Sequence, residues 1–424
     1  MTQAIALIDG NNFYASCEQS LDPALIGRAV VVLSNNDGCI VARSAEARAL
    51  GIAMGTPYFK AQRELEQHNV VVRSSNYALY ADMSQRLMSL LEAHCEDLEI
   101  YSIDEAFGRI SRPANGDLQL WARQLRARVR QTLGLPIAIG LGASKSQAKL
   151  ANRLAKRVPA HAGVFDLGRC SDADAWLESI AIEDVWGIGR KLARWCRLRG
   201  VSNARLLRDM PSGELRAKCG VVGLRLQREL RGQACLPLDL APAPKQETCV
   251  SRSFSRPITS RSELRQAVAT YVVRAAEKLR KQRQRTAALT VYTRTSPFAP
   301  GFYSQAASCR LDLPSNDTAV LLAAALPLVD RIFRPHRQLA KAGVLMQHLQ
   351  GSETLQGHLM VPLSAEEQRR REDLMQTIDL LNRRYGRGTV QWAAGGLHPS
   401  WMMRRERLGR TATTRLSDVP VVSA

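Results

Sequence analysis

Three acidic side chains in two distant motifs of this 424-residue sequence could support phosphoryl-transfer chemistry. Asp9 follows a strand-like apolar run at residues 4–8, and the adjacent Asp104 and Glu105 follow a second run at residues 99–103. Both motifs are therefore expected where a buried strand ends. Carboxylates from neighbouring strands can share Mg²⁺, and two such ions stabilise both the attacking and the leaving oxygen of a phosphoryl transfer. The acids thus predict a site for two Mg²⁺ ions.

The elements that must position these acids divide the chain into segments. Residues up to about 167 alternate strand-like and helical stretches, which is typical of an α/β or α+β catalytic module. Residues 168–238 are predicted to form mostly short helices. Prolines in residues 239–247 predict a stiff linker, because proline continues neither helix nor sheet. A further domain is expected at residues 248–351, followed by a tail at 352–424.

The balance of charge favours a polyanionic partner. Lys and Arg total 59 against 39 Asp and Glu, which gives a formal net charge of +20. Nucleic acid is the leading candidate, a solvated basic surface is the bland alternative, and an anionic membrane surface is less favoured. With neither a long apolar segment nor a signal peptide, a cytoplasmic protein is expected, associated with the nucleoid when it acts. Nine scattered cysteines form no C-x-x-C pair, so reduced thiols are expected.

A glycine-containing turn is the first candidate for contact with nucleic acid. Gly187 and Gly189 alternate with apolar residues between predicted helices, and Lys191 follows them. In a helix-hairpin-helix, such glycines let backbone N–H groups approach a phosphate. An ordinary helix C-cap is the alternative.

The second candidate is a basic segment in the next domain, which contains Lys278, Arg280, Lys281, Arg283 and Arg285. Arg252, Lys281, Arg283 and Arg285 are predicted to contact the nucleic-acid backbone, since no comparable acidic run compensates them. A solvated face is again the alternative. Ser260 and Glu263 predict a capping box for the helix that leads into this segment. The predicted apolar face of that helix comprises Leu264, Ala267, Val268, Tyr271, Val272, Ala275 and Leu279.

Seven motifs, taken together and in order, resemble the Y-family translesion DNA polymerases, and within them the UmuC branch that provides the catalytic subunit of bacterial DNA polymerase V. They lie at residues 9–18, 33–43, 75–84, 101–107, 185–189, 251–254 and 295–298. The resemblance implies an α+β multidomain right hand. Its parts would be a ferredoxin-like palm (1–11 and 80–167), small fingers (12–79), a helical thumb with the helix-hairpin-helix (168–238) and an α/β little-finger domain (248–351).

The resemblance also implies roles for single residues. Asp9 and Asp104 would bridge the metal ions, Glu105 would hold the catalytic one, and the carbonyl of Gly10 would add a ligand. Tyr14 matches the ring that rejects the ribose 2′-hydroxyl. The remaining matches in the nucleotide site are Phe13, which packs beside Tyr14, and the triphosphate contacts Arg48 and Lys156. Lys145 and Lys149 are left open between DNA contact and solvent.

The expected function is template-directed, error-prone DNA synthesis past lesions in the SOS response, without proofreading. The partners implied are primed template DNA, deoxynucleoside triphosphates, a UmuD-type processed subunit, a RecA filament and the sliding clamp. In the clamp-binding peptide, Gln356 and Leu359 fit the expected pattern, but Met360 replaces its aromatic anchor. Weaker binding to the clamp is therefore expected. A non-catalytic DNA-binding scaffold is the main alternative, although such relatives typically lose the metal-binding acids. A repair nuclease or glycosylase built around the Gly187 turn ranks below both.

Overall fold

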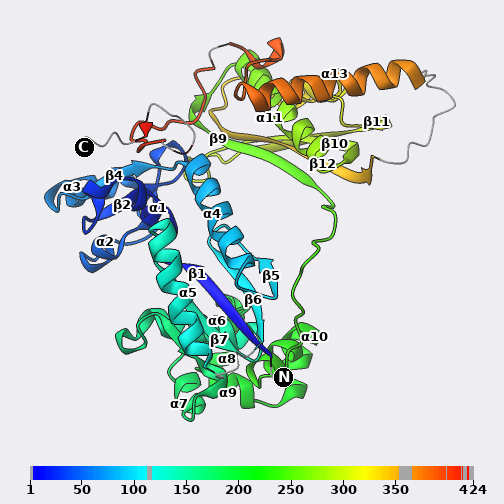
Figure 1. The fold of residues 1–424 in the computed structure, drawn as a ribbon. Coiled ribbons are helices and arrows are strands. Elements are labelled where there is room, and N and C mark those ends of the chain that lie inside the picture. The colour runs from blue at the N-terminus through cyan, green and yellow to red at the C-terminus, as the bar shows by residue number, and fades with distance from the viewer. Residues whose placement is uncertain are drawn as a thin grey trace. The chain divides into compact units, whose positions relative to one another are not determined.

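The computed structural model describes residues 3–111, 117–352, 365–397, 399–411, 413 and 418–419 (Figure 1). The chain forms two compact units. Unit 1 comprises Met1–Pro242 together with Glu406–Ala424, and unit 2 comprises Ala243–Arg405. The chain therefore passes from one unit to the other twice. The segment 352–424, expected as a tail, is divided between the two units, and the other domain boundaries stay predictions.

A five-stranded sheet in unit 1 carries the acidic motifs. Its order is β5-β6-β1-β7-β8, with β1 antiparallel to both of its neighbours and β8 parallel to β7. The strands are β1 (Gln3–Gly10), β5 (Asp97–Ile100), β6 (Glu105–Ser111), β7 (Ile137–Gly142) and β8 (Val164–Asp166).

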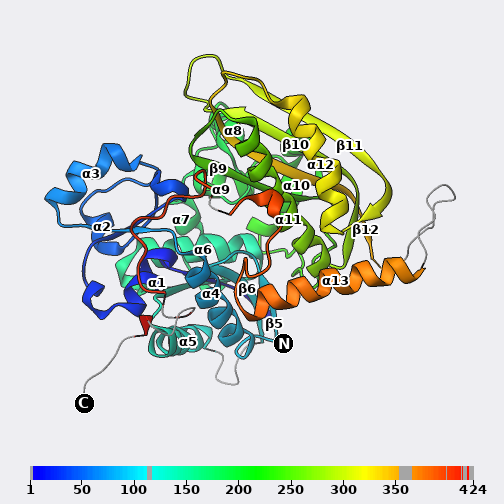
Figure 2. The same cartoon turned by 90° about the horizontal axis from the view of Figure 1, so that it is seen from above.

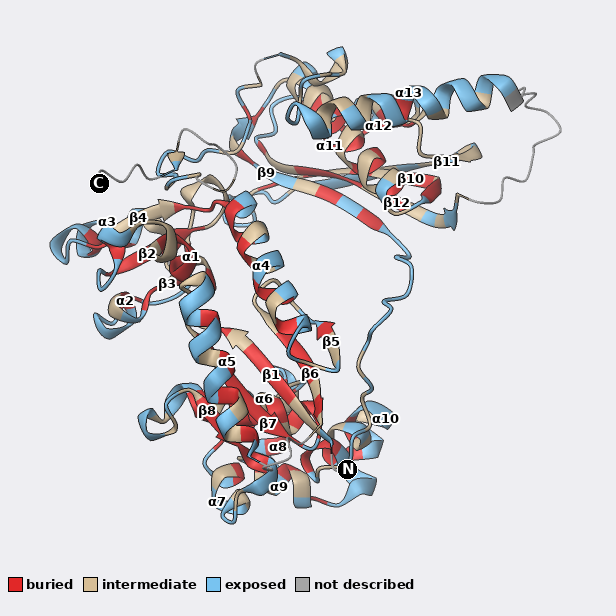
Figure 3. Ribbon diagram, viewed as in Figure 1, coloured by how far each residue is buried: buried red, intermediate tan, exposed pale blue. Residues whose placement is uncertain are grey.

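Helices cover both faces of this sheet, because successive residues of a strand point to opposite sides. Ala6 and Ile8 join the core that includes α4 and α5, whereas Leu7 packs with Phe107 and with Ala148 of α6. Figure 3 shows the central strands of this sheet as largely buried. The helices that pack around the sheet are α1 (Phe13–Leu21), α4 (Tyr77–Glu92), α5 (Leu118–Leu133) and α6 (Lys145–Arg157).

Helix α6 lies unusually close to strand β7. A Cβ atom on Gly140 would lie 2.0 Å from the backbone nitrogen of Asn152, so only glycine fits there. The buried Asn152 amide donates to the carbonyls of Leu7 at 3.2 Å and of Ala138 at 2.8 Å. This packing fixes the helix beside the strand that carries Asp9.

Two smaller groups of elements complete unit 1. A three-stranded sheet of order β3-β2-β4 lies in the predicted fingers, and short helices make up most of the predicted thumb. The fingers contain β2 (Val30–Leu33), β3 (Ile40–Arg43), β4 (Val71–Ser74), α2 (Ala45–Ala49) and α3 (Tyr58–Gln67). The thumb contains α7 (Ala173–Glu178), α8 (Arg190–Arg197), α9 (Ala204–Asp209) and α10 (Ser212–Leu230).

Residues 239–247, the predicted linker, have neither helix nor strand, and the chain before and at Asp239 is bonded within unit 1. Lys145 forms a buried ion pair with Glu99 and donates to the carbonyl of Pro237 at 2.7 Å. The backbone N–H of Asp239 donates to the same Glu99 carboxylate at 2.8 Å. Lys145 is thus buried in the protein and faces neither DNA nor solvent.

Unit 2 is built on a four-stranded antiparallel sheet of order β11-β10-β12-β9. Helices α11 and α12 pack together against it around one hydrophobic core (Figure 2). Its elements are β9 (Thr248–Ile258), α11 (Arg261–Lys281), β10 (Gln284–Thr295), β11 (Ser304–Ser315), α12 (Thr318–Ile332), β12 (Leu339–Gly351) and α13 (Ala365–Arg384).

The capping box predicted for α11 is wrong. Ser260 occupies the N-cap position, but its hydroxyl lies 2.7 Å from that of Ser262 and accepts no backbone N–H. The Glu263 carboxylate accepts a hydrogen bond from Arg256 instead. The Glu263 carboxylate that a capping box would bond to the backbone N–H of Ser260 is thus bonded to a nearby arginine.

Acidic residues of α13 compensate part of the basic segment, so the prediction that no acids do so is wrong at two arginines. Arg280 donates to both carboxylate oxygens of Asp379, at 2.7 and 2.8 Å, and Arg285 donates to Glu372 at 2.7 Å. Both guanidinium groups are largely buried, with side-chain exposures of 11% and 9%. These pairs attach α13 to unit 2.

Candidate active site

The pairing of β1 with β6 brings the three predicted acids together. Asp9 lies directly opposite Glu105 in the antiparallel register. The backbone N–H of Gly10 donates to the carbonyl of Asp104 at 2.7 Å, which holds the third acid beside them. Side chains of directly opposed residues share one face of a sheet and lie within about 5.5 Å of each other at Cβ. The backbone therefore places these three acidic residues, on β1, on β6 and in the turn before β6, at one end of the two strands.

The local structure around Asp104 and Glu105 differs from the predicted strand end. Strand β5 ends at Ile100, and Glu105 begins β6, so residues 101–104 form a hairpin turn. The Ser102 hydroxyl accepts the N–H groups of Asp104 and Glu105 at 3.2 and 3.1 Å and donates to Asp104 Oδ1 at 2.6 Å. A serine side chain that bonds nearby backbone competes with strand pairing. Ser102 therefore ends β5 at Ile100, inside the apolar run of residues 99–103.

Two lysines on one face of α6 pair with two of the acids. Lys156 Nζ lies 2.5 Å from Asp9, and Lys149 Nζ lies 2.9 Å from Glu105. Burial raises the pKa of Asp9 to about 6, although the neighbouring Lys156 acts to lower it. The acids and these lysines form one charged cluster at the edge of the sheet.

The donor set has the chemistry that a hard divalent cation requires, since all of its side-chain ligands are carboxylate oxygens. Within the described ranges, no group of three or more His, Cys, Asp or Glu side chains is gathered closely enough to hold a metal ion. A Cβ atom on Gly10 would lie 2.9 Å from Phe13 Cδ2 and 3.5 Å from the Asp104 carbonyl. The absence of a side chain at Gly10 thus leaves room for the Phe13 ring beside the acids.

An aromatic cluster adjoins the acids. Tyr14 stacks on Tyr80 with ring centroids 4.3 Å apart and meets the edge of Tyr77 at 6.3 Å. Phe13, at 3% exposure, belongs to the hydrophobic core. Burial raises the pKa of Tyr14, so its hydroxyl stays protonated at neutral pH. The stack holds the half-buried Tyr14 ring in one orientation.

The two predicted triphosphate contacts come from different elements. Arg48 lies in the last turn of α2 and is exposed. In the part of the chain that the structure describes, its guanidinium forms no ion pair or side-chain hydrogen bond. Lys156 lies at the end of α6, paired with Asp9. Arg48 therefore has its donors available for a ligand.

Sequence reasoning missed the role of Lys149. Its ammonium group lies 4.4 Å from the ring centroid of Tyr101, 5.3 Å from that of Trp186 and 5.7 Å from that of Phe107. These distances are in the range of cation–π attraction. Trp186 directly precedes the glycine turn of the thumb, so Lys149 connects that turn to the acid Glu105. Nothing in the sequence places these aromatic residues around one lysine.

Comparisons with known proteins agree with this geometry. Family models described as the impB/mucB/samB family and its C-terminal domain match residues 8–153 and 245–359. The protein UmuC of Salmonella typhimurium is 41% identical, covering 98% of this chain and 99% of its own length. SamB of the same organism is 40% identical, covering 98% of each. The chain belongs to the impB/mucB/samB family.

The predicted membership of the UmuC-type Y-family polymerases is thereby confirmed, and with it DNA-directed DNA polymerase activity. A solved chimera of the Y-family DNA polymerases Dbh and Dpo4 aligns with a TM-score of 0.64, covering 82% of this chain and 99% of its own. It is 20% identical and shows the fold, which confirms the predicted multidomain α+β polymerase architecture. A model for a domain of unknown function matches residues 372–422.

In this family member, the thumb turn has the backbone that its glycines favour. Gly187 has a φ of +88°, a left-handed conformation that glycine adopts without strain, and Gly189 is the N-cap of α8. A Cβ atom on either glycine would have no neighbouring atom within 3.4 Å. The turn therefore leaves open space around its backbone.

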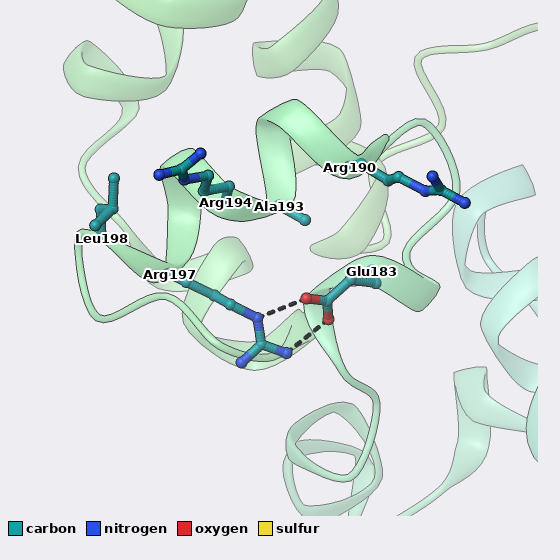
Figure 4. A pocket seen from close by; sticks show the side chains of 6 residues that line it. All are labelled: Glu183, Arg190, Ala193, Arg194, Arg197 and Leu198. Carbon is teal, nitrogen blue, oxygen red and sulfur yellow. Dashed lines mark hydrogen bonds and ion pairs between the residues drawn. The ribbon is translucent and has the colours of Figure 1, made fainter.

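The basic residues after this turn are only partly available. Arg197 donates to both carboxylate oxygens of Glu183, at 2.5 and 2.7 Å, on one side of a shallow pocket (Figure 4). Arg190 and Arg194 also line this pocket and point away from that pair, as Figure 4 shows. Arg199 lies 3.6 Å from Glu214. The pocket lies in the thumb and contains none of the three acids.

The predicted DNA contacts of unit 2 fall into two classes. Arg252, Lys281 and Arg283 are exposed, whereas Arg285 is buried and donates to Glu372. Arg285 is therefore not presented to solvent. The predicted clamp residues Gln356, Leu359 and Met360 lie outside the described residues. No helix among the described residues is long and apolar enough to span a bilayer.

Proposed function

We propose that this polymerase carries out error-prone, template-directed synthesis past DNA lesions by two-metal nucleotidyl transfer, in the response to DNA damage and without proofreading. One observation carries the proposal. Strand pairing sets Asp9 opposite Glu105 and bonds Gly10 to Asp104, which places three acidic residues at one end of the strands beside a basic helix. This combination suits a reaction that needs both divalent cations and a triphosphate.

Asp9, Asp104 and Glu105, together with the carbonyl of Gly10, would hold two Mg²⁺ ions. When bound, the ions assist ionisation of the primer 3′-hydroxyl and departure of pyrophosphate. Lys149 and Lys156 pair with Glu105 and Asp9, and Lys156 would also contact the triphosphate. The fork of Arg48 grips the phosphates by paired hydrogen bonds.

Tyr14 selects the sugar of the incoming nucleotide. Its ring is stacked on Tyr80, which is fully buried and donates a hydrogen bond to Glu18 at 2.8 Å. A ring held in this way cannot swing aside to admit a 2′-hydroxyl. Phe13 supports it from the core.

Backbone contacts position the primed template. We assign them to the N–H groups around Gly187 and Gly189 and to Lys191, Arg252, Lys281 and Arg283, because such contacts are electrostatic and independent of sequence. Arg285 is omitted because it is paired inside the protein. The further partners proposed are a UmuD-type subunit, a RecA filament and a sliding clamp. The site of action proposed is the nucleoid in the cytoplasm.

Primer extension across an abasic site tests the function directly. The assay contains Mg²⁺, the UmuD-type subunit and activated RecA, and compares the natural chain with Asp104→Ala. Asp312→Ala is the matched control, since Asp312 is an exposed aspartate of unit 2. Extension by the natural chain and the control, but not by Asp104→Ala, is the expected result.

The scaffold alternative predicts a different outcome. Equal extension by all three proteins, or none from any of them while DNA binding persists, would transfer the catalytic role to another polymerase.

A further inference from the structure

The end of the chain returns to unit 1 and docks on the edge strand β4. The N–H of Ser74 donates to the carbonyl of Arg407 at 2.9 Å, and the N–H of Arg407 donates to the Ser74 hydroxyl at 2.9 Å. Strand β4 pairs only with β2 in the three-stranded sheet, so its outer edge is available for such bonds. Two reciprocal bonds at one residue fix the register of the returning segment.

Further contacts extend this docking over five residues, 406–410, which we call the strap. The N–H of Glu406 donates to Asp37 Oδ2 at 3.1 Å, next to the small sheet. The Arg407 guanidinium lies 5.0 Å from the ring centroid of Tyr58 in α3. The Asn76 side chain reaches the Arg410 carbonyl at 3.5 Å. The strap lies within the region matched by the domain of unknown function.

Gly409 of the strap closes over a buried carboxylate. A Cβ atom there would lie 2.2 Å from Glu18 Oε2 and 3.4 Å from Arg73 Nε. Glu18 is 3% exposed, and its other oxygen accepts the Tyr80 hydroxyl at 2.8 Å. Because the carboxylate is held by that bond, it cannot move away freely from a side chain at position 409.

Glu18 connects the strap to the candidate nucleotide site. Tyr80 bonds to Glu18 at one end and stacks under Tyr14 at the other, with centroids 4.3 Å apart and planes 13° from parallel. Gly409, Glu18, Tyr80 and Tyr14 thus form an unbroken series of contacts. Burial raises the pKa of Glu18, which agrees with a carboxyl enclosed by protein.

We propose that the strap is a positioning segment: by docking on β4 and closing over Glu18, it holds Tyr80 and, through it, Tyr14. The effect on Tyr14 rests on the nucleotide role proposed above. The docking itself does not, because it is defined by hydrogen bonds to Ser74 and Asp37 and by the contact of Arg407 with the Tyr58 ring. The strap gives the C-terminal region a function inside the catalytic unit.

Two substitutions in the full-length chain test the strap. Gly409→Ala introduces the Cβ atom that meets Glu18, and Arg407→Ala removes the group over Tyr58. Gly213→Ala is the matched control, since a Cβ atom at Gly213 meets nothing within 4 Å. Hydrogen exchange at the Ser74 amide reports docking. Selectivity for deoxyribonucleotides over ribonucleotides, as a ratio of kcat/KM, reports the position of Tyr14. Tyr14→Ala shows whether that ratio depends on the ring.

Release of the strap is expected to speed exchange at Ser74 by about fivefold or more, because the amide loses its acceptor. The selectivity ratio should fall in Gly409→Ala and Arg407→Ala and stay constant in Gly213→Ala. Unchanged exchange at Ser74 in both strap variants overturns the docking. If the strap variants exchange faster at Ser74 but keep the selectivity of the natural chain, while Tyr14→Ala lowers it, the proposed positioning of Tyr14 is overturned. Constant selectivity in Tyr14→Ala refutes the nucleotide role of Tyr14 and the positioning effect with it, while the exchange data still decide the docking.

Discussion

The Nζ atom of Lys149 lies 2.9 Å from Oε1 of Glu105, and both side chains are 17% exposed. A divalent cation at Glu105 would take the place that this ammonium group holds. The pair should therefore affect both the stability of the metal-free protein and the amount by which Mg²⁺ raises that stability.

Lys149→Gln should make the metal-free protein less stable and its response to Mg²⁺ larger. Loss of the ammonium leaves Glu105 without its counter-charge, a change that typically costs about 1–3 kcal/mol. Added Mg²⁺ should then stabilise the variant more than it stabilises the natural chain, since a ligand that binds only the native state stabilises that state. Thermal unfolding with and without Mg²⁺ measures both effects. The exposed Lys218→Gln is the control, and an Mg²⁺-induced rise in Tm equal to that of the natural chain would contradict the prediction.

Asp9 should make the metal-free protein lose stability as pH rises from 5 to 7. Burial raises its pKa from an ordinary value of 3.8 to about 6, although Lys156 acts to lower it. Between those values the native state holds a proton that the unfolded chain has released, so the contribution is present at low pH and lost as pH rises through 6. The change from pH 5 to 7 amounts to ~1 kcal/mol.

Urea unfolding of the natural chain and of Asp9→Asn, without divalent cations, isolates this contribution. The substituted protein should lack the Asp9 part of the pH dependence. Identical pH profiles for the two proteins would show that Asp9 titrates at its ordinary pKa.

Thiol reactivity should be confined to the surface. All nine cysteines are free; Cys249 is exposed, whereas Cys17 is buried. Burial also raises the pKa of Cys95 to about 12, which leaves little thiolate at neutral pH. Iodoacetamide should therefore modify Cys249 first, and Cys249→Ser should remove the fastest labelling phase. Rapid labelling of Cys95 in the native protein would refute this order.

Helix α13 should contribute to the stability of unit 2 through Asp379. Its carboxylate accepts two of the four hydrogen bonds of the largely buried Arg280, so Asp379→Ala leaves that guanidinium with an unpaired charge. A loss of about 2 kcal/mol is expected. Denaturant unfolding measures it, with the exposed Asp373→Ala on the same helix as the control. Equal stability of the two variants would mean that the pair contributes nothing.

Two neighbouring basic residues should differ in their effect on DNA binding. Lys281→Ala removes an exposed charge and should lower the salt dependence of primer-template binding by about one unit of log–log slope. Arg285→Ala removes a buried charge paired with Glu372 and should lower stability without changing that slope. Fluorescence anisotropy at several salt concentrations measures both slopes. A reduced slope for Arg285→Ala would show that it contacts DNA.

The sequence by itself determined the family, the fold class and the identity of the candidate acids. Motif order and local patterns suffice for this, because hydrophobic runs and glycine turns act over a few neighbouring residues. The seven apolar residues predicted on one face of α11 are all buried: Leu264, Ala267, Val268, Tyr271, Val272, Ala275 and Leu279. The hairpin before Glu105 was not predicted, since a single serine hydroxyl determines it.

Only the tertiary structure decided which charges are free and which are paired. Arg285 finds Glu372 across 87 positions and Arg280 finds Asp379 across 99, and Lys149 meets Glu105 and Trp186 from separate elements. The strap likewise joins Arg407 to Ser74 across 333 positions. Pairing depends on distance in space, and a linear pattern carries no information about which remote segment approaches a given side chain.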